Sequence, residues 1–155
     1  MYLISACLIG LNTNYRGKSN VHSLFQWILE AGQCIPFCPE QLAGFATPRP
    51  ACEISGGDGS LVLKNSAKVL TCDGVEVTEK FLVGAYEVLK LAQLVKPEMI
   101  ILKERSPSCG VNFIYDGSFK KILIQGAGVT TSLLQLYGFR TISDEDFIKL
   151  KDSEL

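Results

Sequence analysis

Six cysteines carry the richest chemistry of this 155-residue sequence. Three of them, Cys7, Cys38 and Cys109, end or directly follow short apolar stretches that are far apart in the chain. Cysteine thiolates bind zinc and iron–sulfur clusters, and a thiolate near a positive charge is a nucleophile. The sequence has no C-x-x-C pair, which argues against a zinc ribbon or a thioredoxin-type motif. A site of this kind therefore requires the fold to bring distant cysteines together.

The other cysteines fit a shared site less well. Cys34 and Cys38 would lie on one strand about 13 Å apart, so both cannot ligate one small centre. We expect Cys34 and Cys72 to be small buried core residues. Cys52 lies in a long irregular segment, residues 39–60, and can approach a site there. A loop of this length favours a functional role for the segment.

The elements that must position these residues alternate along the chain. Strands are expected at residues 2–7, 34–38, 98–104 and 139–143, helices at 21–31, 79–95 and 130–137, two short strands within 61–72, a small hairpin at 113–119, and a short amphipathic helix or frayed end at 144–155. Asn20 is the expected N-cap of the first helix. The order predicts a single α/β domain over residues 1–155, with a mainly parallel, Rossmann-like sheet flanked by helices.

A parallel sheet would place the three cysteines at one edge, because all its strands end on the same side. Cys7 ends the first expected strand, Cys38 ends the second, and Cys109 follows the strand at 98–104. Ligands of such sheets bind outside the carboxyl ends of the strands. The prediction fails if the second strand is antiparallel.

Two metal chemistries suit three convergent thiolates. Zinc with an open fourth position is one, although hydrolytic zinc usually takes histidine and carboxylate ligands, and this chain has a single histidine, His22. A 4Fe–4S cluster with three protein ligands is the other, and its open iron can act as a Lewis acid or bind sulfur. We expect the main-chain amides that follow Ser106 and Ser108 to donate hydrogen bonds to cluster sulfurs.

Composition and charge narrow the protein class. The net charge of −1 provides no global attraction to nucleic acid or to a membrane. The apolar runs are far shorter than the roughly 20 residues that span a bilayer. The first residues lack the features of a signal peptide. We expect a cytoplasmic protein with reduced thiols that contacts neither membrane nor nucleic acid, either as a monomer or as a homodimer.

Several stretches resemble a family of small bacterial and archaeal proteins that includes thiouracil desulfidases. They cover nearly the whole chain in the order "ISACLIG", "IPFCPEQLAGFATPRPACEI", "GGDG", "ILKERSPSCG", "IYDGSF" and "GAGVTTSLL". The resemblance implies a 4Fe–4S cluster on Cys7, Cys38 and Cys109 and the non-redox removal of sulfur from a thiolated pyrimidine base. Thr13 and Arg16 stand where family members often have cysteine and aspartate, and Cys52 is also a departure, so the substrate can differ from thiouracil.

The resemblance places the family's acidic residue at Glu40, and the residue types suggest the remaining roles. Glu40 and Ser106 are the catalytic candidates, Ser108 joins the cysteines at the cofactor, and Arg49 and Tyr15 are the substrate-binding candidates. We expect structural ion pairs around the site from Glu53, Glu104 and Arg105, a turn at Asp58, and a helix start near the site in "GAGVTTSLL".

Two alternatives differ in class from a desulfidase. One is a module that stores or delivers a cluster or sulfur without turnover. The other is a transferase with Cys109 as its nucleophile, activated by a helix N-terminus and Arg105.

Overall fold

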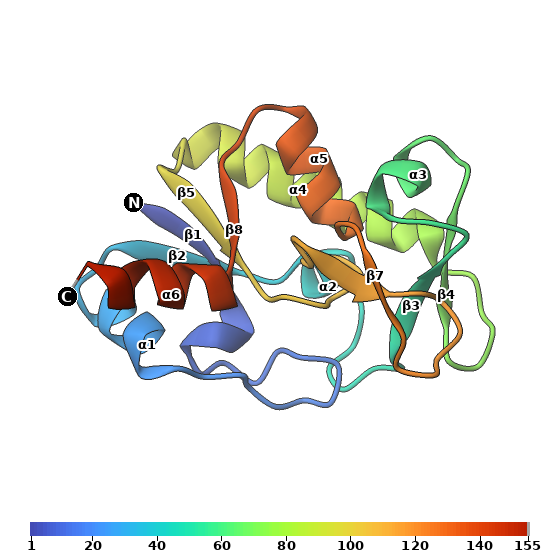
Figure 1. Cartoon of the computed structure of the whole chain (residues 1–155), viewed down its shortest axis with the longest axis horizontal. Coiled ribbons are helices and arrows are strands. Elements are labelled where there is room, and N and C mark those ends of the chain that lie inside the picture. The colour runs from blue at the N-terminus through green and yellow to red at the C-terminus, as the bar shows by residue number, and fades with distance from the viewer. Residues whose placement is uncertain (155) are drawn as a thin grey trace.

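A parallel sheet forms the centre of the molecule in the computed structural model, which describes residues 1–154. Its strands lie in the order β2-β1-β5-β8 (Figure 1). They are β1 (Tyr2–Ser5), β2 (Cys34–Phe37), β5 (Met99–Leu102) and β8 (Thr141–Ser143). Strand β2 runs parallel to β1, with Tyr2 opposite Cys34. The condition on which the shared-edge prediction depends is therefore met.

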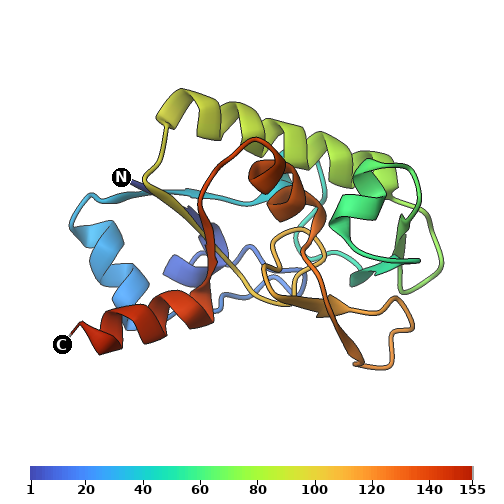
Figure 2. The same cartoon turned by 45° about the horizontal axis from the view of Figure 1, so that its top comes forward.

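Helices cover both faces of this sheet. Helices α4 (Thr78–Val95) and α5 (Val129–Leu136) lie on one face, and α1 (Ser23–Glu30) and α6 (Asp144–Ser153) lie on the other (Figures 1 and 2). Successive strand residues point to opposite faces. Accordingly Leu3 and Ile100 pack into the core under α4 and α5, whereas Ile4 and Ile101 pack under α1 and α6. The predicted α/β class with a mainly parallel, helix-flanked sheet is confirmed.

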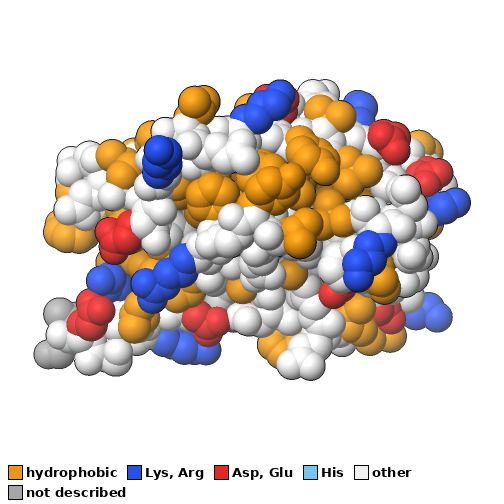
Figure 3. Space-filling model, turned by 90° about the horizontal axis from the view of Figure 1, so that it is seen from above, with side chains coloured by type: hydrophobic (Ala, Val, Ile, Leu, Met, Phe, Trp, Pro, Cys, Tyr) orange, Lys and Arg blue, Asp and Glu red, His pale blue; other side chains and the backbone are white. Residues whose placement is uncertain are grey.

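The outer surface of α4 is apolar in places. Figure 3 shows hydrophobic side chains gathered on the upper face of the molecule, and Val83, Tyr86 and Leu94 of α4 are exposed. No helix among residues 1–154 combines the length and the apolar character needed to cross a bilayer.

Residues 52–71 form a small antiparallel strand pair with a short helix between the two strands. The sequence had predicted the end of an irregular segment and two strands in this region. Strand β3 (Cys52–Ser55) pairs antiparallel with β4 (Lys68–Thr71), and the chain between them contains α3 (Gly59–Leu63). The prediction of two strands within residues 61–72 was wrong for the first of them. Asp58 Oδ1 accepts the backbone N–H groups of Ser60 and Leu61 and so caps a helix at that point.

The predicted small hairpin exists but is longer than expected. Strand β6 (Phe113–Tyr115) pairs antiparallel with β7 (Leu123–Gln125). The Asp116 side chain accepts hydrogen bonds from the backbone N–H and the hydroxyl of Ser118. This local turn starts a wider loop, so the returning strand begins after residue 119.

Two short helical turns follow β1 and β2. The 3-10 turn η1 (Ala6–Ile9) follows β1, and α2 (Pro39–Leu42) follows β2. Cys7 therefore lies just past its strand rather than at its end, and the predicted strand 2–7 was two residues too long.

Asn20 is not the N-cap of α1, because the His22 Nδ1 atom accepts the Leu24 N–H at 3.3 Å.

Candidate functional site

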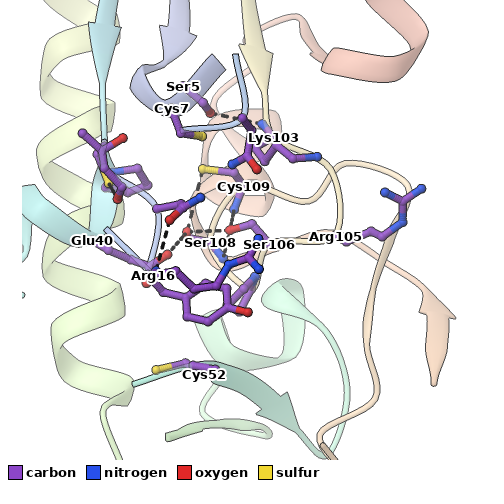
Figure 4. A pocket seen from close by; sticks show the side chains of 18 of the residues that line it. Ser5, Cys7, Arg16, Glu40, Cys52, Lys103, Arg105, Ser106, Ser108 and Cys109 are labelled. Atoms are coloured by element: carbon purple, nitrogen blue, oxygen red, sulfur yellow. Dashed lines mark hydrogen bonds between the residues drawn. The ribbon is translucent and has the colours of Figure 1, made fainter. Parts of the chain in front are cut away.

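A cavity of about 450 Å³ opens at the carboxyl ends of β1, β2 and β5. Its walls come from η1, the loop around Tyr15, the start of α2, strand β3, the hairpin loop, and the loop that follows β5. Figure 4 shows the polar and sulfur-bearing side chains that point into it. Segments that are far apart between residues 5 and 121 therefore build this one site.

Three cysteines meet at this cavity. Cys7 lies in η1, Cys38 is the N-cap of α2, and Cys109 lies in the loop after β5. Cys7 and Cys109 are buried, and Cys38 is partly buried. The side chains of Cys7 and Cys109 point toward one another in Figure 4, whereas Cys52 lies at the opposite end. The structure thus gathers the three cysteines that the shared-edge argument selected.

The electrostatics of the three sulfurs fit a cationic centre. Burial raises the pKa of each thiol, and the neighbouring Cys38 raises the pKa of Cys7 and of Cys109 further. Burial and repulsion between neighbouring thiolates therefore oppose ionisation of these thiols. Bound iron cations would stabilise the thiolate forms. Among residues 1–154, no group of three histidine, cysteine or acidic side chains can hold a single metal ion. Cysteines that each ligate a different iron of a cluster do not need that closer spacing.

The Cys109 loop is held by the start of α5. The backbone N–H of Val129 donates to the Pro107 carbonyl at 2.9 Å, and the Thr131 hydroxyl donates to the Cys109 carbonyl at 2.9 Å. Gly128 permits this approach, because a Cβ atom there would lie 2.5 Å from the carbonyl carbon of Ser108. The expected helix start beside the site is confirmed.

The expectation that loop amides point at cluster sulfurs was wrong. Pro107, which follows Ser106, has no N–H group. The N–H groups of Ser108 and Cys109 both donate to the Ser106 Oγ atom, at 3.2 and 3.1 Å. Ser106 therefore closes the loop as a local cap, and its hydroxyl also lies 3.0 Å from that of Ser108.

Glu104 anchors the other end of the same loop, but not through an ion pair. Its carboxylate accepts backbone N–H groups from Arg105, Val111, Asn112 and Phe113, with the Asn112 side chain donating as well. Burial raises the pKa of Glu104, yet these backbone hydrogen bonds outweigh burial and lower it overall. The anchor is a buried, ionised carboxylate.

The two other residues expected in structural ion pairs behave differently from each other. Glu53 accepts the backbone N–H groups of Gly117 and Phe119, so it holds the hairpin loop rather than a cation. Arg105 does form an ion pair, with Glu145 at 2.7 Å, and it points away from the cavity in Figure 4. The ion-pair expectation therefore holds for Arg105 alone.

A second polar network joins Glu40 to the cysteine loop. One carboxylate oxygen of Glu40 accepts the Arg49 Nε–H at 3.0 Å, and the other accepts the Ser108 hydroxyl at 2.9 Å. Arg49 Nη2 also donates to the Thr13 carbonyl and lies 3.9 Å from the Cys38 sulfur. The Arg49 side chain is only 4% exposed, so its donors are engaged within the wall of the cavity.

The packing of α2 on α4 sets the position of Glu40. Gly84 of α4 lies directly beneath the Pro39 carbonyl oxygen, and a Cβ atom at Gly84 would overlap that oxygen. This close approach fixes the first turn of α2, which carries Cys38 as its N-cap and Glu40 in its first turn.

The remaining candidates are spread more widely. Tyr15 lines the cavity and is 45% exposed, and the Arg16 guanidinium lies 5.7 Å from its ring centroid. Cys52 is on strand β3 and also lines the cavity, where burial raises the pKa of its thiol to about 12. Cys34 is buried as expected, but Cys72 is exposed rather than part of the core.

Three residues near the sulfurs were not identified as site residues from the sequence. The Asn20 side chain lowers the pKa of the Cys7 thiol, against the larger effect of burial, and the Asn20 backbone N–H donates to the Cys7 carbonyl at 2.8 Å. Ser5 and Lys103 also line the cavity. The sequence around Asn20 suggested a helix cap rather than a site residue. Ser5 and Lys103 border apolar stretches, and no motif around them indicates a role in a site.

The comparisons with known proteins agree with this geometry. The sequence matches the family described as 2-thiouracil desulfurase over residues 2–146. It is 41% identical over 146 residues to the uncharacterized protein YbbK of Bacillus subtilis (strain 168), covering 94% of this chain and 97% of that protein. The fold matches the [4Fe-4S]-dependent thiouracil desulfidase TudS with a TM-score of 0.83 and 34% identity, over 98% of this chain and 95% of that one.

Proposed function

The chain belongs to the 2-thiouracil desulfurase family, and we propose that it is an iron–sulfur-dependent desulfidase that converts thiouracil to uracil and sulfide. The observation that supports this most directly is the meeting of three buried or partly buried cysteines at one cavity. Sulfide leaves as HS⁻ or H₂S and the oxygen of water replaces it, so no electrons are exchanged.

Cys7, Cys38 and Cys109 are the residues that would hold a 4Fe–4S cluster in this cavity. With three protein ligands, the bound cluster supplies a Lewis acid that polarises a thiocarbonyl bond. Asn20 and Ser108 flank the sulfurs of Cys7 and Cys109, with the Ser108 hydroxyl 3.7 Å from the Cys109 sulfur. Such hydrogen bonds orient ligands and tune a metal centre.

A chain of hydroxyl groups leads from the cavity to a carboxylate. Ser106 Oγ lies 3.0 Å from Ser108 Oγ, which in turn donates to Glu40 at 2.9 Å. In our proposal, a water molecule that attacks the thiocarbonyl carbon loses its proton through the Ser108 hydroxyl to Glu40. Ser106, whose oxygen already accepts two backbone N–H groups, orients the Ser108 hydroxyl for this transfer. The same proton is then available for the departing sulfur, as in general acid–base catalysis. Arg49 holds the Glu40 carboxylate in place for both transfers.

The open side of the cavity suits a flat, partly apolar base. Tyr15 offers an exposed ring on which a pyrimidine can stack. Cys52 remains a protonated thiol because its pKa is raised, so it provides a small neutral wall. We therefore place the base between Tyr15 and Cys52, with its sulfur toward Cys7 and Cys109. We also retain the proposal of a small-molecule substrate, with no nucleic acid or membrane partner.

The Cys109-nucleophile alternative is the less favoured reading. Burial and the neighbouring Cys38 raise the pKa of the Cys109 thiol, which opposes formation of a nucleophilic thiolate. Arg105, the cation expected to activate it, is paired with Glu145 and points outward.

The test is an anaerobic assay on protein reconstituted with iron and sulfide. Thiouracil should yield uracil and sulfide, and the new uracil oxygen should derive from labelled water. The Cys34→Ala variant is the matched control, because it removes a buried thiol outside the cavity. Activity of colourless, iron-free protein would support the thiol nucleophile, and brown protein inert toward thiolated bases would support a storage or delivery module.

A further inference from the structure

Glu53 is a buried carboxylate in the wall of the cavity, and one of its two oxygens has no partner. The residue lies on strand β3 and is 9% exposed. Its Oε1 atom accepts the backbone N–H groups of Gly117 at 3.0 Å and of Phe119 at 3.2 Å, whereas Oε2 accepts no hydrogen bond from residues 1–154. We propose that Oε2 accepts a ring N–H group of the bound pyrimidine. This inference rests on the proposed function, because it requires a thiolated base in this cavity.

The free oxygen is open to the cavity. Among residues 1–154, the only fully enclosed side-chain nitrogen or oxygen without a hydrogen-bond partner is Thr130 Oγ1. Glu53 Oε2 therefore contacts open space, and the open space that Glu53 lines is the cavity. None of the ion pairs in the same residues includes Glu53. A buried carboxylate without a counter-ion is costly unless its hydrogen bonds are completed, so this oxygen requires a donor from outside the chain.

The two other carboxylates that line the cavity have no such vacancy. Both oxygens of Glu40 accept hydrogen bonds, and so do both oxygens of Glu104. Glu53 therefore offers the one unused carboxylate oxygen in the described wall of the cavity. Thiouracil has two ring N–H groups, at N1 and N3, and a carboxylate oxygen is a strong acceptor for either of them.

The placement of the base agrees with this contact. Cys52, which precedes Glu53 on β3, lies at the end of the cavity opposite Cys7 and Cys109 (Figure 4). A base whose sulfur faces Cys7 and Cys109 directs the rest of its ring toward that end. The acceptor and the ring N–H groups therefore lie on the same side of the thiocarbonyl.

The hairpin loop fixes the direction of the Glu53 carboxylate. Gly117 lies against β3 with φ +93°, and a Cβ atom there would lie 2.6 Å from the Ile54 carbonyl oxygen. Phe119 adopts φ 58°, which is uncommon for a residue with a side chain. Because both backbone N–H groups bind Oε1, the carboxylate cannot rotate without breaking them. Phe119 also lines the cavity, so Glu53 holds this part of the wall as well as a free acceptor.

The experiment combines the variant Glu53→Gln with thiouracil methylated at N1 or at N3. Glutamine can keep its oxygen on the two loop N–H groups, and it then turns an NH₂ donor toward the base. The reverse orientation would set that NH₂ group against the loop donors. Loss of a hydrogen bond to a charged acceptor should lower kcat/KM for thiouracil about 10- to 100-fold, chiefly through KM.

Methylation separates recognition of the base from damage to the loop. In wild type, methylation of the nitrogen that Glu53 binds should lower kcat/KM by a similar factor. Glu53→Gln has already lost this hydrogen bond, so the same methylation should change its kcat/KM by less than about threefold. Coupling at N1 would also restrict the substrate to free bases, because N1 of a nucleoside carries the ribose. Glu76→Gln, at an exposed glutamate outside the cavity, is the matched control and should respond like wild type.

The outcomes distinguish this inference from the proposed function. Effects of Glu53→Gln and of methylation that multiply at both nitrogens would make Glu53 a purely structural residue and leave the desulfidase standing. If Glu53→Gln does not fold, the wild type decides alone: equal kcat/KM for thiouracil and both methylated bases would overturn the contact, and a loss with either one would support it. No turnover of thiouracil by cluster-containing wild type would overturn the proposed function, and this inference with it.

Discussion

Replacing Glu104 with glutamine should weaken the cysteine loop in a pH-dependent way. The Glu104 carboxylate is 4% exposed and accepts hydrogen bonds from four backbone N–H groups and from the Asn112 side chain. Glutamine replaces one acceptor oxygen with a donor that faces Asn112. Losing two hydrogen bonds to a charged acceptor costs about 3–5 kcal/mol. The free energy of unfolding should therefore fall by about that amount at neutral pH.

The pH dependence follows from the lowered pKa of Glu104, which backbone hydrogen bonds produce against the opposing effect of burial. Stability from an acid with a depressed pKa is fully present above its unfolded value, about 4.3 for glutamate. It is lost as the pH falls through the folded value. The stability difference between wild type and Glu104→Gln should therefore be constant from about pH 7 to pH 5 and shrink below about pH 4.

Urea unfolding of cluster-free protein, followed by circular dichroism across this range, measures the difference; cluster-free protein is used because acid destroys iron–sulfur clusters. Glu30→Gln, at an exposed position of α1, is the control and should have little effect. A difference below about 1 kcal/mol, or one that does not change with pH, would refute the role of Glu104 as an ionised anchor.

Three other substitutions test separate parts of the site. Glu40→Gln leaves the buried Arg49 without its counter-ion, so it should cost about 3–5 kcal/mol of stability and at least about 100-fold in turnover; iron analysis should still find the cluster. Gly128→Ala should displace the Ser108 backbone and reduce the iron content, whereas a normal iron content would show that the contact can relax. Cys52→Ala should keep the iron content and change the KM for thiouracil, and loss of iron would instead make Cys52 a ligand.

The sequence predicted the parallel sheet and its site edge because the strand and helix patterns are strong there. The near-continuous apolar runs of β1 and β5 match a sheet covered on both faces. The pattern failed in the segment that contains β3 and α3. A four-residue strand between prolines and glycines has too little periodicity to recognise, and the side-chain cap at Asp58 decides between helix and strand for the residues after it.

The candidate site was predicted in outline through the cysteines, but its polar interactions were not. Glu40, Arg49 and Ser108 were named as candidates. That they form one hydrogen-bonded chain could not be predicted from the sequence. Glu104 looked like a member of an ion pair because it precedes Arg105. The loop instead turns its N–H groups inward, and those contacts depend on a conformation that a sequence pattern does not encode.

Iron and sulfide analysis of the cysteine variants tests the central claim most directly. Anaerobically reconstituted wild type and Cys34→Ala should each bind about four irons and four sulfides per chain, as a 4Fe–4S cluster requires. Cys7→Ser, Cys38→Ser and Cys109→Ser should each lose the cluster together with thiouracil turnover. Retention of a full cluster and activity in any one of these three variants would contradict the assignment of that sulfur as a ligand.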